Sequence, residues 1–484
     1  LCEGPHRQQV NRVVCTLVLM TSPFRVAVVG AGPSGLTFAS ILSREAQGEL
    51  SVDVFERDSR ERDQGAGWDV DHAGQAALRR AGVDLARISR EGSDTFRVFR
   101  VGQPEPLLVP GLPGVIKRVS HRFWPPCPET NRHAMREGLL NALDSRSASV
   151  HFGRAAADLR LVESTGQAEL LDRTGRSMGC YDLVVDAGGV ASPLRRCRVA
   201  EPPDMEQHYT GITMLYGVIP DPESVCTPTH LRQLGQGTLS LLGPLRNGNG
   251  TVVFLQRFGA RAEDRRATIG IMFQRDHIGD LADELGLARH SRVLTDAEPH
   301  ELRRVQGWIK EQLSDQWRDL HKVVDSSVSL SVRPILCFPF APTLRHGNLP
   351  LVCIGDALHA LPSYTGSSGN LALVDAAALA TALCEFLSEQ DLDRTHLLEV
   401  LRSQEQSMIE RARPVGEQEK SARELVLRIL QTPHYLEECS TYKLFRGDGW
   451  TMWSAAAFAL YSVIHGVNRL DGFGMSPVRL SSDH

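Results

Sequence analysis

Three glycines near the N-terminus have the spacing of a phosphate-binding turn. Gly30, Gly32 and Gly35 stand as G-x-G-x-x-G in the segment VAVVGAGPSGLTFA, directly after an apolar run. In such a turn the first glycine permits a tight bend and the second lets a pyrophosphate approach the backbone. The third lets the following helix pack closely on the strand. The start of that helix offers free backbone N–H groups to the phosphate, so Pro33 and Ser34 are further candidates for cofactor binding.

An acidic residue follows at the distance expected for a contact with ribose. Glu56 ends an alternating segment and lies about 20 residues after the glycine turn, which is the usual spacing. A carboxylate at this place accepts both ribose hydroxyls and repels a 2′-phosphate, so the turn is predicted not to bind NADP. FAD and NAD both remain compatible with it.

A second glycine-rich segment decides between these two cofactors. LPLVCIGDALHALPSYTGSSGNLALVDAAALATAL combines a buried strand, the pair Gly355-Asp356, a loop and a helix. Asp356 at the strand end can hydrogen-bond a sugar hydroxyl, and the loop 362–370 can direct backbone N–H groups at an anionic ring oxygen. A flavin must be held at both its adenine and its isoalloxazine end, whereas NAD dehydrogenases do not need this second element. The sequence therefore predicts FAD.

The glycine turn needs regular elements on both sides of it. Apolar runs predict strands at 24–29 and 50–55, and a helix over 34–44 connects them, so the strands should be parallel with a right-handed crossover. Further helices are predicted at 71–81, at 130–143 with Asn131 as the cap, at 298–313 and at 370–387. A charged helical segment over 395–431 should break at Pro414.

These elements predict an α/β fold with two sheets. We expect a Rossmann-like FAD-binding domain with a mixed parallel sheet, formed by residues 21–208 and 341–390. Residues 209–340 should form a substrate domain with an antiparallel sheet, and residues 391–484 a C-terminal helical region. Residues 1–20 are an N-terminal extension. Strands near Thr213, Leu215, Leu241, Phe254 and Met272 are candidates to line the substrate pocket, but the sequence leaves open which alternate positions face it.

Composition excludes several classes of protein. The chain has 484 residues, a formal net charge of -5 and 42% hydrophobic residues, which suits a soluble globular protein and gives no basic field for nucleic acid. The ten cysteines form no C-x-x-C pair and no zinc-like spacing with histidine. We therefore predict no metal site, reduced thiols and a cytoplasmic location. The apolar run 450–467 is interpreted as a buried or interfacial helix, with a membrane anchor as the alternative.

The motifs together resemble the class A flavin monooxygenases, the family of p-hydroxybenzoate hydroxylase, and most closely the tetracycline destructase branch. The resemblance covers residues 24–411. It is carried by the glycine turn with Glu56-Arg57, by GAGWDV, NRHAMREGLL and DLVVDAGGVASPLRR, and by the Gly355-Asp356 segment.

The resemblance implies a role for each matching residue. Glu56 and Arg57 would hold the adenosine part of FAD, and Arg136 would reach the diphosphate or ribityl region. Asp69 would lie near the flavin edge, unless it is only a turn residue. Asp356 would bind the ribityl or pyrophosphate part. The last turn of the loop would present its backbone to the pyrimidine edge of the ring, and it contains Gly366, Ser368, Gly369 and Asn370.

The chain departs from the family pattern at two places. The family has Asp-Gly where this chain has Gly188-Gly189, although Ser192 and Arg195 are kept, and this leaves the binding mode of the nicotinamide open. Many members have two adjacent prolines and a Gly-x-Gly, whereas here Pro362 is followed by Ser363 and Ser368 replaces the second glycine. Pro362 and Ser363 are the candidate catalytic residues. The Ser363 hydroxyl would bond a peroxide or a substrate carbonyl, or merely fill space.

The family's reaction is the expected activity. NADPH or NADH would reduce FAD, and O2 would add to give a flavin C4a-hydroperoxide that transfers one oxygen atom to an aromatic, polyketide-like or other secondary-metabolite substrate. Hydroxylation, epoxidation and Baeyer–Villiger insertion all remain open. His359 is interpreted as structural rather than as an acid or base. The alternatives are a flavin oxidase or dehydrogenase, and a non-catalytic flavin-binding or membrane-tethered protein.

Overall fold

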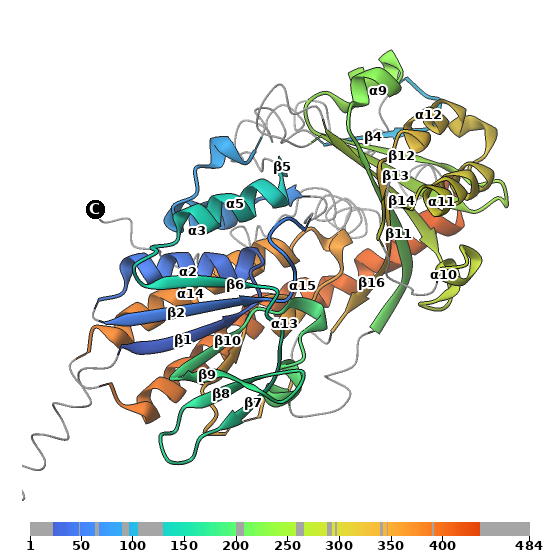
Figure 1. The fold of residues 1–484 in the computed structure, drawn as a ribbon. Helices are drawn as coiled ribbons and strands as arrows, with labels where there is room; N and C mark the ends of the chain where they lie inside the picture. Colours follow the sequence, from blue (N-terminus) through green and yellow to red (C-terminus); the bar gives the residue numbers. More distant parts are fainter. Residues whose placement is uncertain are drawn as a thin grey trace, which may run out of the picture.

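A computed structural model describes residues 23–47, 49–62, 67–89, 96–104, 129–199, 208–257, 266–287, 293–295, 298–338, 342–345, 347–389 and 392–435. The predictions made for residues 1–20 and 450–467 lie outside these residues. Figure 1 shows two units, each built on a sheet, with the long helix α15 reaching from one to the other.

The first unit contains a parallel sheet of five strands. Neighbouring strands follow the order β17-β10-β1-β2-β6, and every pair is parallel. The strands are β1 (Phe24–Val29), β2 (Leu50–Glu56), β6 (Ala148–Phe152), β10 (Leu183–Asp186) and β17 (Leu351–Cys353). The strands predicted at 24–29 and 50–55 and the α/β fold class are confirmed.

The two faces of this sheet are covered in different ways. Helices cover one face, and a small antiparallel sheet of β7 (Ala156–Leu161), β8 (Ala168–Asp172) and β9 (Ser177–Tyr181) covers the other. The helices are α2 (Pro33–Glu45), α3 (His72–Arg80), α5 (Arg132–Ala142) and α14 (Ser368–Leu387). Burial on both faces explains why β1 reads as the continuous apolar run FRVAVV. All four helices match the sequence predictions, and the Asn131 side chain caps α5 by accepting from the Ala134 amide at 2.9 Å.

Helix α14 is apolar because it is a core helix. By length and composition it could cross a membrane, yet it packs against α2, α3 and α15. This burial accounts for its composition without a bilayer.

The second unit contains a sheet of seven strands in the order β15-β16-β11-β14-β13-β12-β4. Its strands are β4 (Phe96–Arg100), β11 (His208–Ile219), β12 (Thr238–Pro244), β13 (Gly250–Arg257), β14 (Ala267–Gln274), β15 (Val293–Thr295) and β16 (Ser329–Cys337). The pairs are antiparallel except for β4, which pairs with β12 in parallel. Strand β4 comes from within residues 21–208, so the first part of the predicted FAD-binding domain contributes one strand to the second sheet.

Short helices cover the outer face of the second sheet, as Figure 1 shows. The predicted helix at 298–313 is confirmed as α11. The helices and helical turns of this unit are α8 (Pro222–Val225), α9 (Pro228–Leu234), α10 (Asp280–Glu284), α11 (Pro299–Gln312), η3 (Asp315–Leu320) and α12 (His321–Asp325). The remaining short elements belong to the first unit or to the junction: β3 (Trp68–Asp69), η1 (Leu85–Arg87), β5 (Glu129–Thr130), η2 (Gly189–Ala191), α6 (Arg195–Arg198), α13 (Asp356–His359) and η4 (Ser363–Thr365).

The break predicted at Pro414 is wrong, because α15 (Arg394–Gln431) continues through that residue. A proline inside a helix costs roughly 3 kcal/mol, mainly through a lost hydrogen bond. Both halves of α15 are anchored strongly enough to offset this. Glu405 upstream forms a buried ion pair with Arg198, and Glu419 downstream accepts a hydrogen bond of 2.6 Å from the Tyr364 hydroxyl. Apolar residues are buried on both sides of the proline, and each fully buried aliphatic side chain contributes about 1.5–3 kcal/mol.

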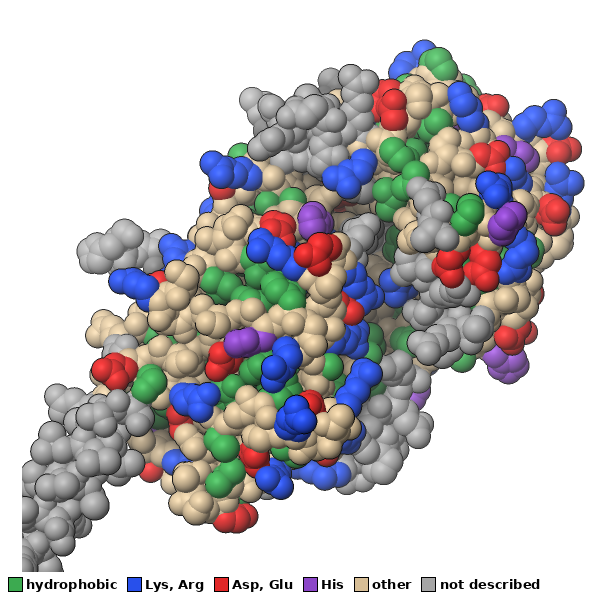
Figure 2. Space-filling view, in the orientation of Figure 1, with side chains coloured by type: hydrophobic (Ala, Val, Ile, Leu, Met, Phe, Trp, Pro, Cys, Tyr) green, Lys and Arg blue, Asp and Glu red, His purple; other side chains and the backbone are tan. Residues whose placement is uncertain are grey.

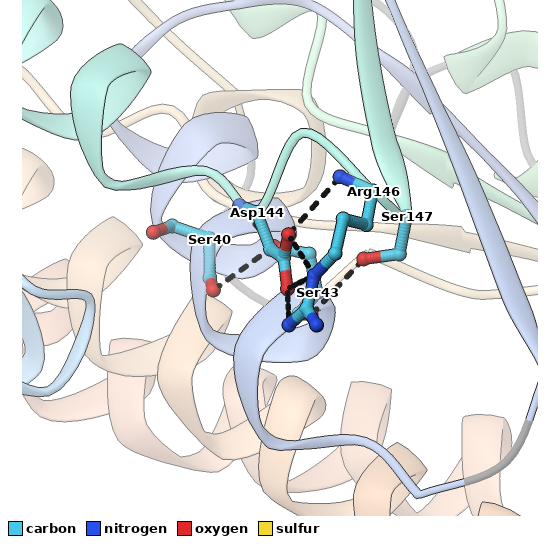
Figure 3. Close-up of polar contacts among 5 residues, drawn as sticks. All are labelled: Ser40, Ser43, Asp144, Arg146 and Ser147. Carbon is cyan, nitrogen blue, oxygen red and sulfur yellow. Dashed lines mark hydrogen bonds and ion pairs between the residues drawn. The ribbon is translucent and has the colours of Figure 1, made fainter.

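The C-terminal half of α2 is held by hydrogen bonds within the protein, which Figure 3 shows. The Ser43 hydroxyl donates to the Ser40 carbonyl at 3.2 Å and accepts from the Asp144 amide at 3.3 Å. Ser147 donates to the Ser43 carbonyl at 3.0 Å, and Arg146 pairs with Asp144 at 2.7 Å. These contacts fix the turn between α5 and β6 against α2 at the end of the helix farthest from the glycine turn.

Candidate active site

The glycine turn has the geometry that its sequence predicts, with a different task for each glycine. Gly30 has φ of +108°, and a Cβ there would lie 2.4 Å from the Ala187 carbonyl oxygen. A Cβ on Gly35 would lie 2.2 Å from the Gly30 carbonyl oxygen. Gly32 has an ordinary φ of -82° and nothing within 4 Å of its Cβ position. The fold therefore requires Gly30 and Gly35, whereas Gly32 leaves an open space beside the first turn of α2.

The start of α2 offers hydrogen-bond donors to this space. Its N-cap, Gly32, provides no side-chain cap, and Pro33 follows as the first residue of the helix. The Ser34 hydroxyl is buried and has no hydrogen-bond partner among the described residues. Unpaired backbone N–H groups and the helix dipole favour an anion at such a place.

Glu56 lies at the end of β2, next to the glycine turn. Its carboxylate accepts from the Ala31 amide at 2.9 Å and from the Asp58 amide at 2.9 Å. Each carboxylate oxygen has a second lone pair, so the group can still accept from ribose hydroxyls. Arg57 is half-exposed, and its guanidinium lies 3.7 Å from the Asp58 carboxylate.

Arg136 lies on the same side of the site as Glu56. Its side chain is fully buried, and its guanidinium stacks over the Phe152 ring at 5.2 Å. One nitrogen donates to the Arg60 carbonyl at 3.2 Å, while Nε and Nη2 have no partner in the described part of the chain. Since Phe152 pairs with Glu56 across the sheet, Arg136 lies on the Glu56 side of the site; its predicted contact with the diphosphate or ribityl region stays a prediction.

Sequence reasoning missed Arg132, which is the first residue of α5. Its guanidinium lies deep among protein groups, close to Asp356, and yet its side chain is accessible to solvent. Burial lowers the pKa of Arg132, Asp356 opposes this shift, and Arg62 and Arg136 add to it. A sequence signal for Arg132 exists, because this residue directly follows the predicted helix cap Asn131. The first residue of this helix lies at the edge of the sheet that also holds the glycine turn.

The second motif meets the first at this edge. Gly355 has φ of +58°, and a Cβ on it would lie 3.2 Å from the Ser34 hydroxyl. Asp356 begins α13 and accepts a hydrogen bond from the Ser368 hydroxyl. The structure thus brings Ser34, Asp356, Ser368 and Arg132 together, although they come from three distant parts of the chain.

The end of the glycine-rich loop packs on the small ribbon formed by β3 and β5. A Cβ on Gly369 would lie 2.7 Å from the Trp68 ring. The Asn370 side chain donates to the Asp69 carbonyl at 3.0 Å and to the Gly366 carbonyl at 3.3 Å, and it accepts from the Asp71 amide at 3.1 Å. The Asn370 side chain therefore holds the loop in place, and Gly366 provides its left-handed turn with φ of +67°.

The candidate catalytic residues lie where the loop meets the second sheet. Pro362 is buried and Ser363 is exposed. The Ser363 side chain lies close to the Tyr216 hydroxyl of β11. Burial raises the pKa of Tyr216 to about 12, an effect that Ser363 opposes. The sequence suggested two roles for the Ser363 hydroxyl, a bond to a peroxide or substrate carbonyl and simple space filling. Its contact with Tyr216 adds a third role that the sequence did not suggest.

The structure shows which strand positions of the second sheet face the loop. Phe254 and Met272 lie on the same face as Tyr216 and pack in the cluster that contains Tyr364. Leu215 and Leu241 pack in the opposite cluster, under the outer helices. Thr213 is fully buried and its hydroxyl lies 2.7 Å from that of Tyr209. The sequence left open which alternate positions face the pocket, and Leu215 and Leu241 point away from the loop.

A buried acid lies at the junction of the two units. Glu129 of β5 pairs with Asp69 across the ribbon, and its carboxyl group is buried close to Gln256 of β13. Burial raises the pKa of Glu129 well above its usual value, and Asp69 raises it further. The fold therefore favours the protonated form of Glu129, which can donate as well as accept.

The altered segment at Gly188-Gly189 still has a carboxylate. Asp186 accepts from the Ser192 hydroxyl at 2.7 Å and from the Gly188 amide at 3.0 Å. Arg195 donates to the carbonyls of Ala357 and Leu358 at 2.6 and 2.7 Å, behind Asp356. Ser192 and Arg195 thus serve the fold by tying β10 to α13.

His359 has the surroundings of a structural residue. It is fully buried and lies 2.5 Å from the Asp375 carboxylate, which also pairs with Arg411 at 2.9 Å. Burial opposes protonation, but the contact with Asp375 holds the pKa of His359 above its ordinary value. Among the described residues no group of three or more His, Cys, Asp or Glu side chains could hold a metal ion.

The residues at this edge fit FAD. Gly32 leaves the open space that a pyrophosphate needs, the donors of α2 and Arg132 suit its charge, and Glu56 suits a ribose. Comparisons with known proteins agree. The FAD binding domain family matches residues 296–401, and the NAD(P)-binding Rossmann-like domain family matches residues 28–70. A relative, monooxygenase penA of Penicillium thymicola, is 23% identical over 400 residues, covering 76% of this chain and 86% of the relative.

The two domain matches and the monooxygenase relative support an FAD-dependent oxidoreductase that resembles the class A FAD-dependent monooxygenases. Solved structures share its fold. HpxO of Klebsiella pneumoniae, in complex with FAD and uric acid, aligns with a TM-score of 0.62 at 18% identity, over 91% of this chain and 97% of that one. A tetracycline destructase aligns with a TM-score of 0.58 at 15% identity, over 91% and 98%. Since these two scores are close, the assignment to the destructase branch stays a prediction.

Proposed function

We propose that FAD lies along the shared edge of the two motifs, with its ring at the loop 362–370. The N–H groups of α2 and the guanidinium of Arg132 would hold the diphosphate, and Glu56 would accept from the adenosine ribose. Asp356, with Ser368, would accept from the ribityl chain. The support for this arrangement is that Gly32 faces open space, while Asp356 is near enough to Arg132 to influence its pKa.

The bound flavin supplies the redox chemistry, taking electrons from NADPH or NADH and activating O2. The protein's own residues bind, orient and exclude water. Phe254, Met272 and Met214 give the second sheet an apolar surface opposite the loop, and Tyr216 lies close to Ser363 at the junction. No side chain has to act as a nucleophile. We propose that the enzyme inserts one oxygen atom into an aromatic or polyketide-like secondary metabolite held between this surface and the loop.

One observation carries this proposal. Tyr364 of the loop packs in one apolar cluster with Met214 and Met272 of the second sheet, which supports a substrate site between that sheet and the loop. A substrate bound on that face would have its reacting carbon next to the flavin.

The experiment is to incubate the holoenzyme with NADPH and a panel of polycyclic aromatic and polyketide compounds under ¹⁸O2. Product mass is the readout. We expect a gain of one oxygen atom that carries the heavy isotope. Loss of two hydrogens would instead identify an oxidase or dehydrogenase. NADPH oxidation that no compound stimulates, with no product, would identify a flavin-binding protein without oxygen transfer.

A further inference from the structure

The second unit contains a cavity of about 240 Å³ between α9, η3 and the turn that follows β4. Figure 1 shows α9 at the far end of this unit from α2, so the cavity is separate from the proposed FAD site. A cavity of about 150 Å³ holds benzene, so this one has room for a molecule of about 10 non-hydrogen atoms. The buried residues of its lining are Val101, His230, Gln233, Trp317 and Leu320.

Hydrogen bonds hold the walls of this cavity together. The Trp317 indole N–H of η3 donates to the Pro244 carbonyl at 2.8 Å, so the ring offers apolar surface to the cavity. The Gln233 side chain of α9 donates to the Gln103 carbonyl at 3.0 Å. These bonds tie η3 to β12 and α9 to the turn after β4, and the cavity is therefore part of the fold.

His230 has a buried ring nitrogen without a partner. Only 6% of the residue is exposed, and its Nδ1 atom forms no hydrogen bond with any residue that the structure describes. Burial lowers the pKa of His230, so the imidazole is neutral at pH 7 and one ring nitrogen has a lone pair that can accept. Since buried polar groups in proteins are normally hydrogen-bonded, His230 indicates a ligand with a donor.

The charge at the cavity favours a cation. Of the lining residues that the structure describes, Asp319 alone has a side chain that is charged at pH 7, and no lysine or arginine is among them. Asp319 is close enough to His230 to raise its pKa, against the larger effect of burial. Figure 2 shows acidic and basic side chains interspersed over the visible face of the second unit, whereas Lys and Arg gather where the two units meet. An anion is therefore favoured at that junction and a cation at the cavity.

We propose that this cavity binds a small organic amine, whose ammonium group donates to His230 and pairs with Asp319 while its apolar body lies against Trp317. An ammonium group has three donors, so one group can serve both residues. Its charge strengthens each of these hydrogen bonds. An alcohol of the same shape could bond to His230 but would not pair with the carboxylate. The site is independent of the proposed function, because it involves neither the flavin nor oxygen transfer.

The test titrates matched amines and alcohols into the FAD-loaded protein by isothermal calorimetry. The pairs are benzylamine and benzyl alcohol, 2-phenylethylamine and 2-phenylethanol, and hexylamine and hexanol, which differ in the shape of the apolar body. In at least one pair we expect the amine to bind about 10-fold more tightly or better, as for hydrogen bonds to a charged group. Equal binding within every pair, including no binding at all, would overturn the inference.

Variants show whether the amine lies in this cavity. His230→Phe keeps a flat ring without the acceptor and should weaken amine binding by about 10-fold. Asp319→Asn should weaken it by about 3-fold, because this carboxylate is exposed, and for the same reason the change leaves the fold intact. Asp315→Asn is the matched control: it removes a carboxylate of η3 that does not line the cavity, and amine binding should not change.

FAD affinity should stay the same in all three variants, since the cavity is separate from the glycine turn. Amine binding that survives both His230→Phe and Asp319→Asn would contradict the assignment. So would an equal loss of amine binding in Asp315→Asn and Asp319→Asn, because it would reflect the general charge of η3 and not the cavity.

Discussion

The two ends of helix α2 use the same residue types for opposite purposes. At the C-terminal end Ser40 and Ser43 bond to other protein groups, and Asp144 pairs with Arg146. At the N-terminal end the Ser34 hydroxyl has no partner in the described part of the chain, and Gly32 borders open space. A buried polar group without a partner costs about 1–3 kcal/mol, so a protein keeps one mainly where something else pairs with it. The polar residues at the C-terminal end of α2 therefore stabilise the fold, whereas Ser34 and Gly32 at the N-terminal end are available to a ligand.

The largest effect is expected from filling the open space at the N-terminal end. Gly32→Val should weaken FAD binding by about 100-fold or more, because it displaces the diphosphate from several charge-assisted hydrogen bonds. The unfolding temperature of the FAD-free protein should change little, since Gly32 has an ordinary φ and no neighbour within 4 Å. Calorimetry of unfolding and FAD titration measure the two quantities.

Gly30→Ala is the matched control for this variant. A Cβ there would meet the Ala187 carbonyl oxygen at 2.4 Å, and φ is +108°, so this change should lower the unfolding temperature of the FAD-free protein. If Gly32→Val bound FAD as tightly as the natural chain, the cofactor would not lie at this turn.

The next effect distinguishes two arginines on α5. Arg132→Ala should raise the dissociation constant of FAD by about 10- to 100-fold, because it removes a cation beside the diphosphate. Arg87→Ala, on an exposed arginine that pairs with Asp84, should leave FAD binding unchanged. The conclusion would be reversed if Arg136→Met weakened FAD binding while Arg132→Ala did not.

A smaller effect concerns pH at the junction of the two units. The pKa of Glu129 is raised in the folded protein, so its neutral form stabilises the fold fully below the unfolded-state pKa near 4.5. That stabilisation is lost as the pH rises through the folded-state pKa. Glu129→Gln mimics the neutral acid, so the unfolding temperature of the variant should rise relative to the natural chain as the pH increases. Thermal unfolding from pH 4 to pH 8 measures this difference.

Glu169→Gln provides a control of opposite sign. The hydrogen bond from Arg160 lowers the pKa of Glu169, so its carboxylate stabilises the fold above pH 4.5 and loses this effect as the pH falls. The variant should therefore lose stability relative to the natural chain as the pH increases. If the unfolding temperatures of the two variants, each taken relative to the natural chain, changed in the same direction with pH, Glu129 would not be stabilised in its neutral form.

The smallest effect is expected at the C-terminal end of α2. Hydrogen bonds from Arg146 lower the pKa of Asp144 to about 2, so its carboxylate contributes from above pH 3.8 and loses its effect as the pH falls through 2. Asp144→Asn should lower the unfolding temperature at pH 7 by no more than about 2 °C, because the pair is exposed. FAD affinity should not change. A loss of FAD affinity would mean that the C-terminal end of α2 also serves the cofactor and not only the fold.

Much of the fold could be predicted because its elements are strongly patterned. The strand at β1 is a continuous apolar run, and α14 is a long apolar helix, so burial alone defines them. Pro414 misled the prediction because a local rule was applied to a helix that is anchored by tertiary contacts on both sides. The junction of the second sheet with β4 was missed because a parallel edge strand distant in sequence leaves no local signal.

The site could be predicted only where a motif fixes the backbone. The glycine turn and Glu56 follow from spacing, since each role depends on local geometry. The choice between Arg132 and Arg136 depends on which turn of α5 lies beside Asp356, and the facing of Leu215 and Leu241 depends on the phase of each strand. Both require three-dimensional contacts that one sequence does not contain. The same holds for Tyr216, which lies close to Ser363 although the two residues are far apart in the chain.

The central claim is that the N-terminal end of α2 holds FAD. The most direct test is titration of the purified chain with FAD, with the Gly32→Val variant beside it. The account predicts one equivalent of FAD bound per natural chain and almost none per variant chain. A natural chain that remains colourless and takes up no FAD would contradict it.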